Sequence, residues 1–428
     1  MPEHDRAATP GDGLVARPRQ GLTPPPRVRL SVAEYRAELL ALVEPDHRSE
    51  RVALDEAQGR VLAEDVLAAT ANPAFDNSAM DGYAVRYADV SELPARLQVV
   101  GELPAGSSWD PDLGPGECVL IMTGAPLPTR ADTVVPLEDT DGGRDWVEVA
   151  ATPGALGAHV RRSGEDYPAG AVVAVAGTRL APGSLGAVAT AGATAVAARP
   201  RPVVAVCATG DELVDDGAEL GRGRLHESNS HALAAALRRD GAEVVRGAPL
   251  PDDAAALARW LDASAPGADL VLLTGGASVG AHDVVRDLLT ARAGGVFRHV
   301  MVQPGKPQGW ARWAGTPVVA LPGNPLSATL CYEVFVRPLL ARRLGCPPPA
   351  SLVAVAASGW SCPPGRAQVV PVVLASAEDG RLLARPAHPR GSASHLASSL
   401  ASADAIALVG EQVEQVAAGD LLEVQVLA

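Results

Sequence analysis

The chain has 428 residues, enough for about three domains of ordinary size, and a formal net charge of −14. It contains no run of Lys or Arg that would form a basic face, so neither nucleic acid nor an anionic membrane is expected as a partner. The five cysteines form no CxxC pair and their number is odd, which argues against a disulfide framework and favours a reducing, cytoplasmic compartment.

The N-terminal region is predicted to contain a polar lead and then two short helices. Residues 1–27 are polar and rich in Pro and Gly, so we expect them to form a disordered lead. Ser31 and Glu34 match the capping-box pattern at the start of an amphipathic stretch, which predicts a helix that ends near Val43. A second helix is expected at about 53–59.

Short apolar runs alternate with Gly and Pro from about residue 70 to residue 200, a pattern typical of strands and turns. We therefore expect one or two β-rich domains in this region. Residues 181–198 are uncharged, but their glycines predict turns and short strands and argue against a membrane span.

The region 201–345 alternates apolar strand-like runs with helical stretches. This alternation predicts βαβ crossovers and an open, mostly parallel sheet, with a ligand at the carboxyl ends of the strands. The predicted strands lie at 203–208, 243–248, 269–274, 296–302 and 317–321, and the last predicted helix lies at 327–344. Residues 350–428 return to strands, with no long helix expected.

Loops of unusual composition follow the five predicted strands. Because the carboxyl ends of parallel strands lie at one edge of a sheet, we expect these loops to converge on one crevice. The loops are 209–212, 252–253, 274–280 with Asp283, 304–307 and 321–327.

Each loop suits an anionic ligand, although each also has a structural explanation. The glycines of 274–280 let backbone N–H groups approach a phosphate, or they form only a tight turn. Lys306, held between two prolines, offers a point charge to an anion, or it is a solvated turn residue. Glu212 and Asp283 suit Mg²⁺ that bridges carboxylate and phosphate oxygens, although an Asp can equally cap a helix. The convergence of five such loops favours a ligand site.

Two charged motifs lie in the β-rich half. Residues 75–83 carry Asp76 and Asp81 among small residues, and residues 161–166 place two arginines beside two acids. The arginine pair suits bidentate binding of an oxyanion, and a structural turn with a surface ion pair is the alternative.

These motifs together resemble the molybdopterin molybdenumtransferases, a family that includes the C-terminal domain of gephyrin. The resemblance extends from about residue 30 to residue 428 and follows the order of the family. It rests on strings that include FDNSAMDGYAV, RRSGED, ATGDEL, GGASVG, PGKPQG and LPGNPLSATL. Each string alone is weak evidence, but the series is specific.

The resemblance implies an α/β multidomain protein that forms an elongated homodimer. Its central open-sheet α/β domain would be like the molybdopterin adenylyltransferase, and it would be joined to a β-rich lid, an N-terminal linking domain and a C-terminal β-barrel. The expected bounds are 28–70 with 150–200 for the linking domain, 71–149 for the lid, 201–345 for the α/β domain and 350–428 for the barrel.

The resemblance also implies a reaction in which molybdate is inserted into adenylylated molybdopterin and AMP is released, with Mg²⁺ as cofactor. The molybdopterin adenylyltransferase is an implied partner, and Asp81 would be contributed across the dimer by the partner's lid. The acids that match catalytic positions are Asp81, Asp166, Glu212, Asp252 and Asp283, of which Glu212 and Asp283 would hold the metal. The matching substrate-binding residues are Thr123, Arg161, Arg162, Thr209, Gly210, Gly275, Gly276, Ser278, Gly280, Pro304, Lys306, Pro322, Asn324 and Ser327.

Several positions depart from the pattern of the family. His299 and Gln303 stand where familiar relatives carry lysines, and Asn229 is followed by Ser230 where an arginine is usual. If His299 faces the oxyanion, its attraction would depend on protonation near its ordinary pKa of roughly 6.5. If it packs away from the ligand, it has no such role.

Two other functions fit the same residues. A non-catalytic molybdopterin-binding scaffold of the same fold is one alternative, although a scaffold would have no need of all five acids. Tungstate is the other, because it is nearly the same size and charge as molybdate and the sequence does not separate the two.

Overall fold

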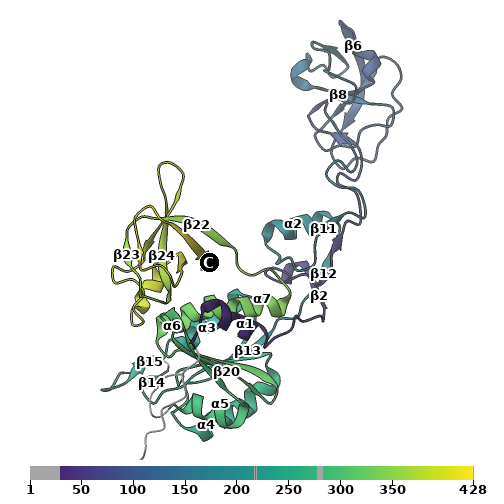
Figure 1. The fold of residues 1–428 in the computed structure, drawn as a ribbon. Coiled ribbons are helices and arrows are strands. Elements are labelled where there is room, and N and C mark those ends of the chain that lie inside the picture. Colours follow the sequence, from purple (N-terminus) through teal and green to yellow (C-terminus); the bar gives the residue numbers. More distant parts are fainter. Residues whose placement is uncertain (1–28, 216, 218, 277–282, 428) are drawn as a thin grey trace, which may run out of the picture.

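The computed structural model describes residues 29–215, 217, 219–276 and 283–427, so the expected lead lies outside the described residues. Figure 1 shows an α/β body, a β-barrel beside it, and a narrow arm that carries a separate β-rich domain, the lid, at its far end. The expected α/β multidomain class is confirmed. Within the described residues, every helix is too short or too polar to span a lipid bilayer.

The central sheet has seven strands in the order β1-β18-β20-β21-β17-β13-β16. Neighbours from β21 to β16 are parallel, whereas β20 is antiparallel to both of its neighbours. The strands are β1 (Arg29–Leu30), β13 (Val203–Ala208), β16 (Glu243–Arg246), β17 (Leu270–Thr274), β18 (Val296–Val300), β20 (Pro307–Trp313) and β21 (Thr316–Leu321). The sheet is therefore open and mostly parallel, as expected.

The sequence analysis did not predict strand β20, because the turn between β20 and β21 begins with a residue that is not typical of turns. The residues between β20 and β21 are Ala314 and Gly315, with φ angles of +48° and +92°. A two-residue hairpin with both central residues in this region normally carries Asn or Gly at the first position, and an alanine there gives no turn signal.

Helices bury both faces of the central sheet. Along β13, Val204 and Val206 pack in one apolar cluster with helices α1, α3, α6 and α7, whereas Ala205 and Cys207 pack in a second cluster with α4 and α5. Successive side chains of a strand point to opposite faces, so a strand covered on both sides is apolar throughout. The helices are α1 (Val32–Leu40), α3 (Asn229–Arg239), α4 (Ala254–Ser264), α5 (Val284–Ala293), α6 (Pro325–Cys331) and α7 (Arg337–Leu344).

The helix predictions succeed where local signals are strong. The capping box of α1 is confirmed: the Ser31 hydroxyl accepts the Glu34 N–H at 3.2 Å, and the Glu34 carboxylate accepts the Ser31 N–H at 2.8 Å. The helix expected at 53–59 is only a 3₁₀ turn, Leu54–Glu56. The helix expected at 327–344 is divided by a π-helical turn, Tyr332–Val336, into α6 and α7.

The prediction of turns and strands for residues 181–198 is wrong for its first half. Helix α2 (Pro182–Thr190) occupies it, followed by strand β12 (Ala195–Ala198). Proline is tolerated in the first turn, and the Ser184 hydroxyl accepts the Ala181 N–H at 2.8 Å. Val188 is completely buried in the core of the arm, so packing overrides the poor helix propensity of the glycines.

Short strand pairs build the arm, and a five-stranded sheet builds the lid. In the arm, β2 (Glu50–Ala53) pairs with β12, and β3 (Val66–Leu67) pairs with β11 (Val172–Ala174). The pair β4 (Asn77–Ser78) and β10 (Val160–Arg161) lies where the chain enters and leaves the lid. The lid sheet has the order β8-β5-β7-β6-β9, with β5 at Gly82–Val85, β6 at Ala95–Leu103, β7 at Glu117–Ile121, β8 at Thr133–Pro136 and β9 at Trp146–Val149.

The C-terminal region forms a closed five-stranded barrel. Its order is β24-β25-β22-β28-β26, and β26 pairs back with β24. The strands are β22 (Ser351–Ala356), β24 (Ala367–Ser376), β25 (Leu382–Pro386), β26 (Ala405–Val409) and β28 (Leu421–Val426), with β23 (Trp360–Ser361) and β27 (Gln415–Val416) as a separate pair. Strand β19 (Val302–Gln303), from the α/β segment, adds to the barrel by pairing with β24.

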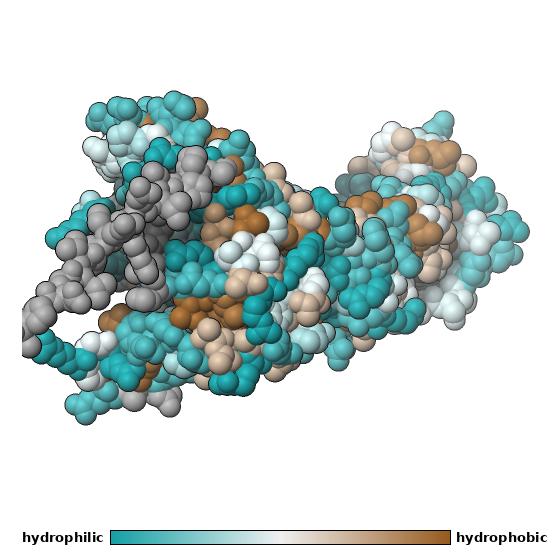
Figure 2. All heavy atoms as spheres, turned by 60° about the horizontal axis from the view of Figure 1, so that its bottom comes forward, coloured by the Kyte–Doolittle hydropathy of each residue, from teal (hydrophilic) through white to brown (hydrophobic). Residues whose placement is uncertain are grey.

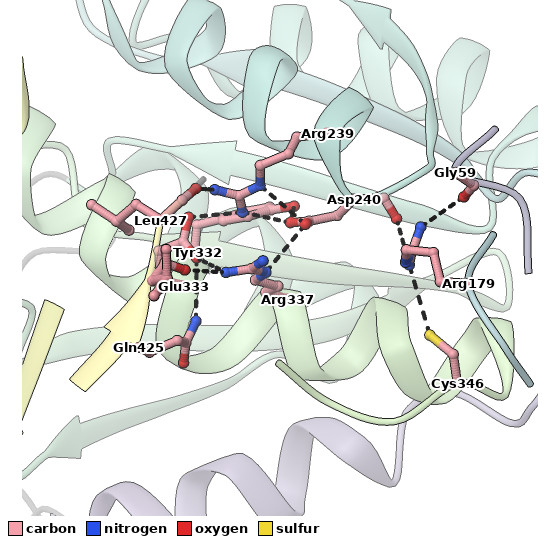
Figure 3. Close-up of polar contacts among 11 residues, drawn as sticks. Gly59, Arg179, Arg239, Asp240, Tyr332, Glu333, Arg337, Cys346, Gln425 and Leu427 are labelled. Atoms are coloured by element: carbon pink, nitrogen blue, oxygen red, sulfur yellow. Dashed lines mark hydrogen bonds and ion pairs between the residues drawn. The ribbon is translucent and has the colours of Figure 1, made fainter. Parts of the chain in front are cut away.

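A buried ionic cluster joins the α/β body to the barrel (Figure 3). The Asp240 carboxylate accepts hydrogen bonds from Arg239 at 2.7 Å, from Arg337 at 3.1 Å and from the Tyr332 hydroxyl at 2.7 Å. The Glu333 carboxylate accepts from Arg239 at 2.9 Å and from Arg337 at 3.1 Å. Two acids and two arginines therefore balance each other in charge.

Further hydrogen bonds connect this cluster to the neighbouring domains. Arg337 donates to the Val426 carbonyl oxygen at 3.0 Å, and Arg239 donates to that of Leu427, so both arginines hold the end of the last barrel strand. On the other side, Arg179 of the arm donates to the main-chain oxygen of Asp240 at 3.1 Å. Asp240 is thus in contact with the α/β body, with the barrel through the arginines, and with the arm.

We predict that Arg337→Met destabilises the protein by about 3–5 kcal/mol, because it leaves buried negative charge uncompensated. The side chain of Glu333 is 2% exposed. Denaturant unfolding measures the effect, with Arg381→Met as control, since Arg381 and its partner Asp379 are more than half exposed. An equal loss of stability in the two variants would contradict the prediction.

Candidate functional site

A cavity of about 660 Å³ lies at the carboxyl edge of the central sheet. Residues from all five predicted loops line it, together with residues of the β14 (Leu213–Val214) and β15 (Leu225–His226) pair and of the barrel. The lining residues that match predicted site positions are Thr209, Gly210, Glu212, Asp252, Gly275, Gly276, Asp283, Pro304, Lys306, Pro322, Asn324 and Ser327. Ser278 and Gly280 lie outside the described residues.

The loops after β13 and β17 are in direct contact. The Thr209 N–H donates to the Thr274 carbonyl oxygen at 2.8 Å. Gly275 has a φ of +87°, and a Cβ at this position would collide with the Thr209 carbonyl oxygen. A glycine is therefore required for the two loops to meet at the cavity wall.

Asp252 is close to the carboxylates of Asp211 and Glu212. Burial raises the pKa of Asp252, and the nearby negative charges of Asp211 and Glu212 raise it further, against a backbone hydrogen bond with Asp211 that lowers it. Carboxylate oxygens are ligands that Mg²⁺ prefers, and Glu212, Asp252 and Asp283 all line the cavity.

Asp283 caps helix α5. Its carboxylate accepts the Arg286 N–H at 2.9 Å, and the residue is 3% exposed. The structural explanation that the sequence left open is therefore correct for this residue. The same residue lines the cavity, and a carboxylate has two oxygens, so capping is compatible with ligand binding.

Lys306 contributes positive charge to the lining of the cavity. Burial lowers the pKa of Lys306, and the positive charge of Arg366 lowers it further. Arg366, just before barrel strand β24, donates to the side-chain oxygen of Gln303 at 3.2 Å, and Gln303 lines the cavity. The neutral Gln303 thus holds a guanidinium close to Lys306.

The barrel also supplies polar lining residues that the sequence analysis did not identify. Ser392 and Ser394 line the cavity, and the Asn324 amide donates to the Ser394 hydroxyl at 3.1 Å. Ser392 and Ser394 lie in the string GSASHLASSLASADAI, which resembles the family, whereas Arg366 lies outside the strings that carry the resemblance. His226, Glu227, Ser228 and Asn229 are further lining residues that were not predicted.

His299 lies on β18, half-buried and paired with Pro307 in the β18–β20 ladder. It is not among the described residues that line the cavity. The hypothesis that its protonation controls oxyanion binding therefore has no geometric support.

The predicted residues of the lid and arm form a second group that does not reach this cavity. Its members, none of which is among the described lining residues, are Asp81, Thr123, Arg161, Arg162 and Asp166. The lid stands apart from the α/β body in the ribbon and forms a separate lobe in the space-filling view (Figures 1 and 2). One chain therefore holds the predicted acids in two distant places.

The second group is well ordered by hydrogen bonds. Asp81 accepts from both the Thr123 N–H and the Thr123 hydroxyl at 2.7 Å, and these bonds lower its pKa. Arg162 pairs with Asp76 at 2.6 Å, so part of the arginine pair is used in a turn, as the alternative reading of the motif proposed. Asp166 accepts from the Asn72 amide at 2.8 Å.

The fold and the cavity define a multidomain α/β protein with acids and a lysine gathered in a cavity at the carboxyl edge of its sheet. Three family models match successive parts of the chain. They are described as the MoeA N-terminal region (domain I and II), which matches 30–192, "Probable molybdopterin binding domain", which matches 205–342, and the MoeA C-terminal region (domain IV), which matches 353–427.

Relatives and solved structures agree with these models. The chain is 44% identical to molybdopterin molybdenumtransferase 2 of Mycobacterium tuberculosis over 87% of this chain and 94% of the relative. It is 36% identical to molybdopterin molybdenumtransferase 1 of the same species, over 93% and 99% of the two chains. A crystal structure of the molybdopterin biosynthesis moeA protein from Pyrococcus horikoshii is similar with a TM-score of 0.80 and 27% identity, covering 93% of this chain and 100% of that chain. The chain belongs to the molybdopterin molybdenumtransferase family.

We predict that oxyanion binding in the cavity is lost as the pH rises. The loss should occur at a lower pH than it would for a lysine with an ordinary pKa. Only the protonated Lys306 attracts an anion, and its pKa is below the usual 10.5, so affinity is full below that pKa and is lost as the pH rises through it. Arg366→Gln should move the loss to higher pH, because it removes a neighbouring positive charge. Calorimetric titration with molybdate at several pH values measures this, and Arg381→Gln, an exposed barrel arginine, is the control. Identical pH profiles for all three proteins would contradict the prediction.

Proposed function

We propose that this protein inserts molybdate into adenylylated molybdopterin, forming molybdenum cofactor and releasing AMP in a Mg²⁺-dependent reaction. As a member of its family, the protein is an enzyme of molybdenum cofactor biosynthesis, a molybdopterin molybdenumtransferase. The observation that carries the proposal is the meeting of acids and a lysine from five loops at one cavity, which the barrel completes.

Lys306 and Arg366 are proposed to bind the molybdate oxyanion. Molybdate must lose oxygens as it is inserted, which requires groups that hold and transfer protons. Asp252 suits this role, because its raised pKa lets it hold a proton closer to neutral pH than an ordinary aspartate. The cavity is thus lined by acids and by a lysine that has Arg366 near it.

The sulfur ligands of the metal come from the dithiolene of the substrate, so no cysteine of the protein is needed. Burial raises the pKa of the Cys118 and Cys207 thiols to about 12, and that of Cys331 further. These thiols are therefore protonated at neutral pH and unsuited to nucleophilic or ligand roles.

Glu212 and Asp283 would hold the Mg²⁺, and a bound Mg²⁺ would supply charge neutralisation to the pyrophosphate group of the adenylylated substrate, whose phosphoanhydride bond must break to release AMP. Asp252 lies on the same wall and would support the charge balance. The adenylylated substrate must be supplied by an adenylyltransferase, which we propose as a partner in a cytoplasmic pathway.

We further propose a homodimer in which the partner's lid completes the cavity. The acids Asp81 and Asp166 are held in place by hydrogen bonds, yet they stand far from the cavity of their own chain. A second copy that brings its lid over the cavity would give both groups a role in one site.

Glu212→Gln and Asp283→Asn should each lower AMP release from adenylylated molybdopterin by more than about tenfold, because each removes a metal-binding charge. Asn retains the capping ability of Asp283, so the loss would not come from a damaged helix α5. Asp253→Asn is the matched control, since Asp253 caps α4 and is not among the described lining residues. Near-normal turnover in the two cavity variants would remove these acids from the mechanism.

Mixing Asp81→Ala subunits with Asp283→Asn subunits should restore activity if the site is shared across the dimer. Each variant alone lacks an essential acid in every site, whereas a mixed dimer has one site with both acids intact. AMP release and reconstitution of an apo-molybdoenzyme measure the recovery. Subunit exchange without recovery would show that the site lies within one chain.

A further inference from the structure

Asn229 holds the loop after β21 at the cavity wall. It is the first residue of α3, is 7% exposed and lines the cavity. Its amide nitrogen donates to the Gly323 carbonyl oxygen at 2.7 Å and lies 3.4 Å from the Thr274 hydroxyl. One side chain thus connects α3 with the loops that follow β17 and β21.

The orientation of the Asn229 amide is determined by its neighbours. The nitrogen end must face Gly323, because the amide oxygen would repel the carbonyl oxygen there. The amide oxygen is buried and has no hydrogen-bond partner among the described residues. An unpaired buried acceptor costs stability, so the favourable contribution of this side chain comes from its donor.

The hydrogen bond from Asn229 to Gly323 fixes the direction of the Asn324 N–H group. The peptide between Gly323 and Asn324 is trans, so its C=O and N–H point in opposite directions. With the carbonyl oxygen turned to Asn229, the Asn324 N–H points away from Asn229, and no hydrogen bond among the described residues uses it. Gly323 gives little resistance to rotation of this peptide, so an external bond is needed to hold it.

We propose that Asn229 is a positioning residue that holds the Gly323–Asn324 peptide with its N–H toward the anionic group of the substrate. This proposal rests on the proposed function and names how the cavity recognises a phosphate oxygen. Gly323 and Asn324 both line the cavity, and the Asn324 side chain is directed to Ser394, so its main chain is left for the ligand. Loss of the Asn229 donor would let the peptide turn its carbonyl oxygen toward the anion and repel it.

Two nearly isosteric variants test this proposal by calorimetric titration with inorganic pyrophosphate. Asn229→Leu has no donor, and Asn229→Asp has a donor only when its carboxyl group is protonated. At pH 8, both should bind pyrophosphate at least about tenfold more weakly than the wild type. As the pH falls toward 5, Asn229→Asp should recover affinity relative to Asn229→Leu, because its O–H then donates to the Gly323 carbonyl oxygen.

Titration of the surrounding groups affects both variants alike, so its effect on affinity cancels when the two variants are compared. The titratable groups that line the same cavity in all of the proteins are Glu212, His226, Glu227, Asp252, Asp283 and Lys306. Circular dichroism and thermal unfolding would be used to check that both variants fold.

The outcomes separate this proposal from the proposed function. Pyrophosphate affinity within twofold of the wild type in Asn229→Leu, parallel pH profiles for the two variants, or no binding to the wild type would each overturn the role of Asn229. Pyrophosphate binding needs no turnover. A wild type that binds pyrophosphate but releases no AMP would therefore overturn the proposed function and leave the role of Asn229 intact.

Discussion

The register of three parallel strands is the constraint on which the site depends. Ala208, Thr274 and Leu321 are paired across β13, β17 and β21, so the three strands end level with one another. The residues that follow them must then leave the sheet side by side, and the loops are in contact from their first residues. Burial of both faces of these strands makes the register hard to shift, because a slip by one residue would exchange the two faces.

The proposed anion site lies in a protein with a net charge of −14. Charges at the far surface are screened over roughly 8 Å at physiological ionic strength, so the local composition of the cavity decides what it binds. Glu212 and Asp252 come from the loops after β13 and β16, and Lys306 comes from the loop before β20, with Arg366 of the barrel segment near it. The barrel also contributes Ser392 and Ser394 to the lining, so the α/β domain alone does not make the site.

The sequence predicts well what depends on neighbouring residues. The strands of the central sheet other than β1 and β20, the capping box of α1 and the five loops all have local signals in composition and spacing. Helix α2 was missed because burial of Val188 decides it, and strand β20 was missed because its turn carries alanine. Arg366 escapes prediction because it is near Lys306 only through the packing of the barrel. Such contacts form between residues distant in sequence, where no local pattern records them.

The loop 304–307 connects strands that belong to two different sheets. Strand β19 is hydrogen-bonded to the barrel, and β20, directly after the loop, belongs to the central sheet. The ends of the loop are therefore anchored in separate sheets, and a rotation of the barrel on the α/β body would change the distance between them. A short loop has few conformations that span a given distance. The conformational entropy of the loop that carries Lys306 would therefore depend on the angle between two domains, and an anion that ordered this loop would also favour one angle.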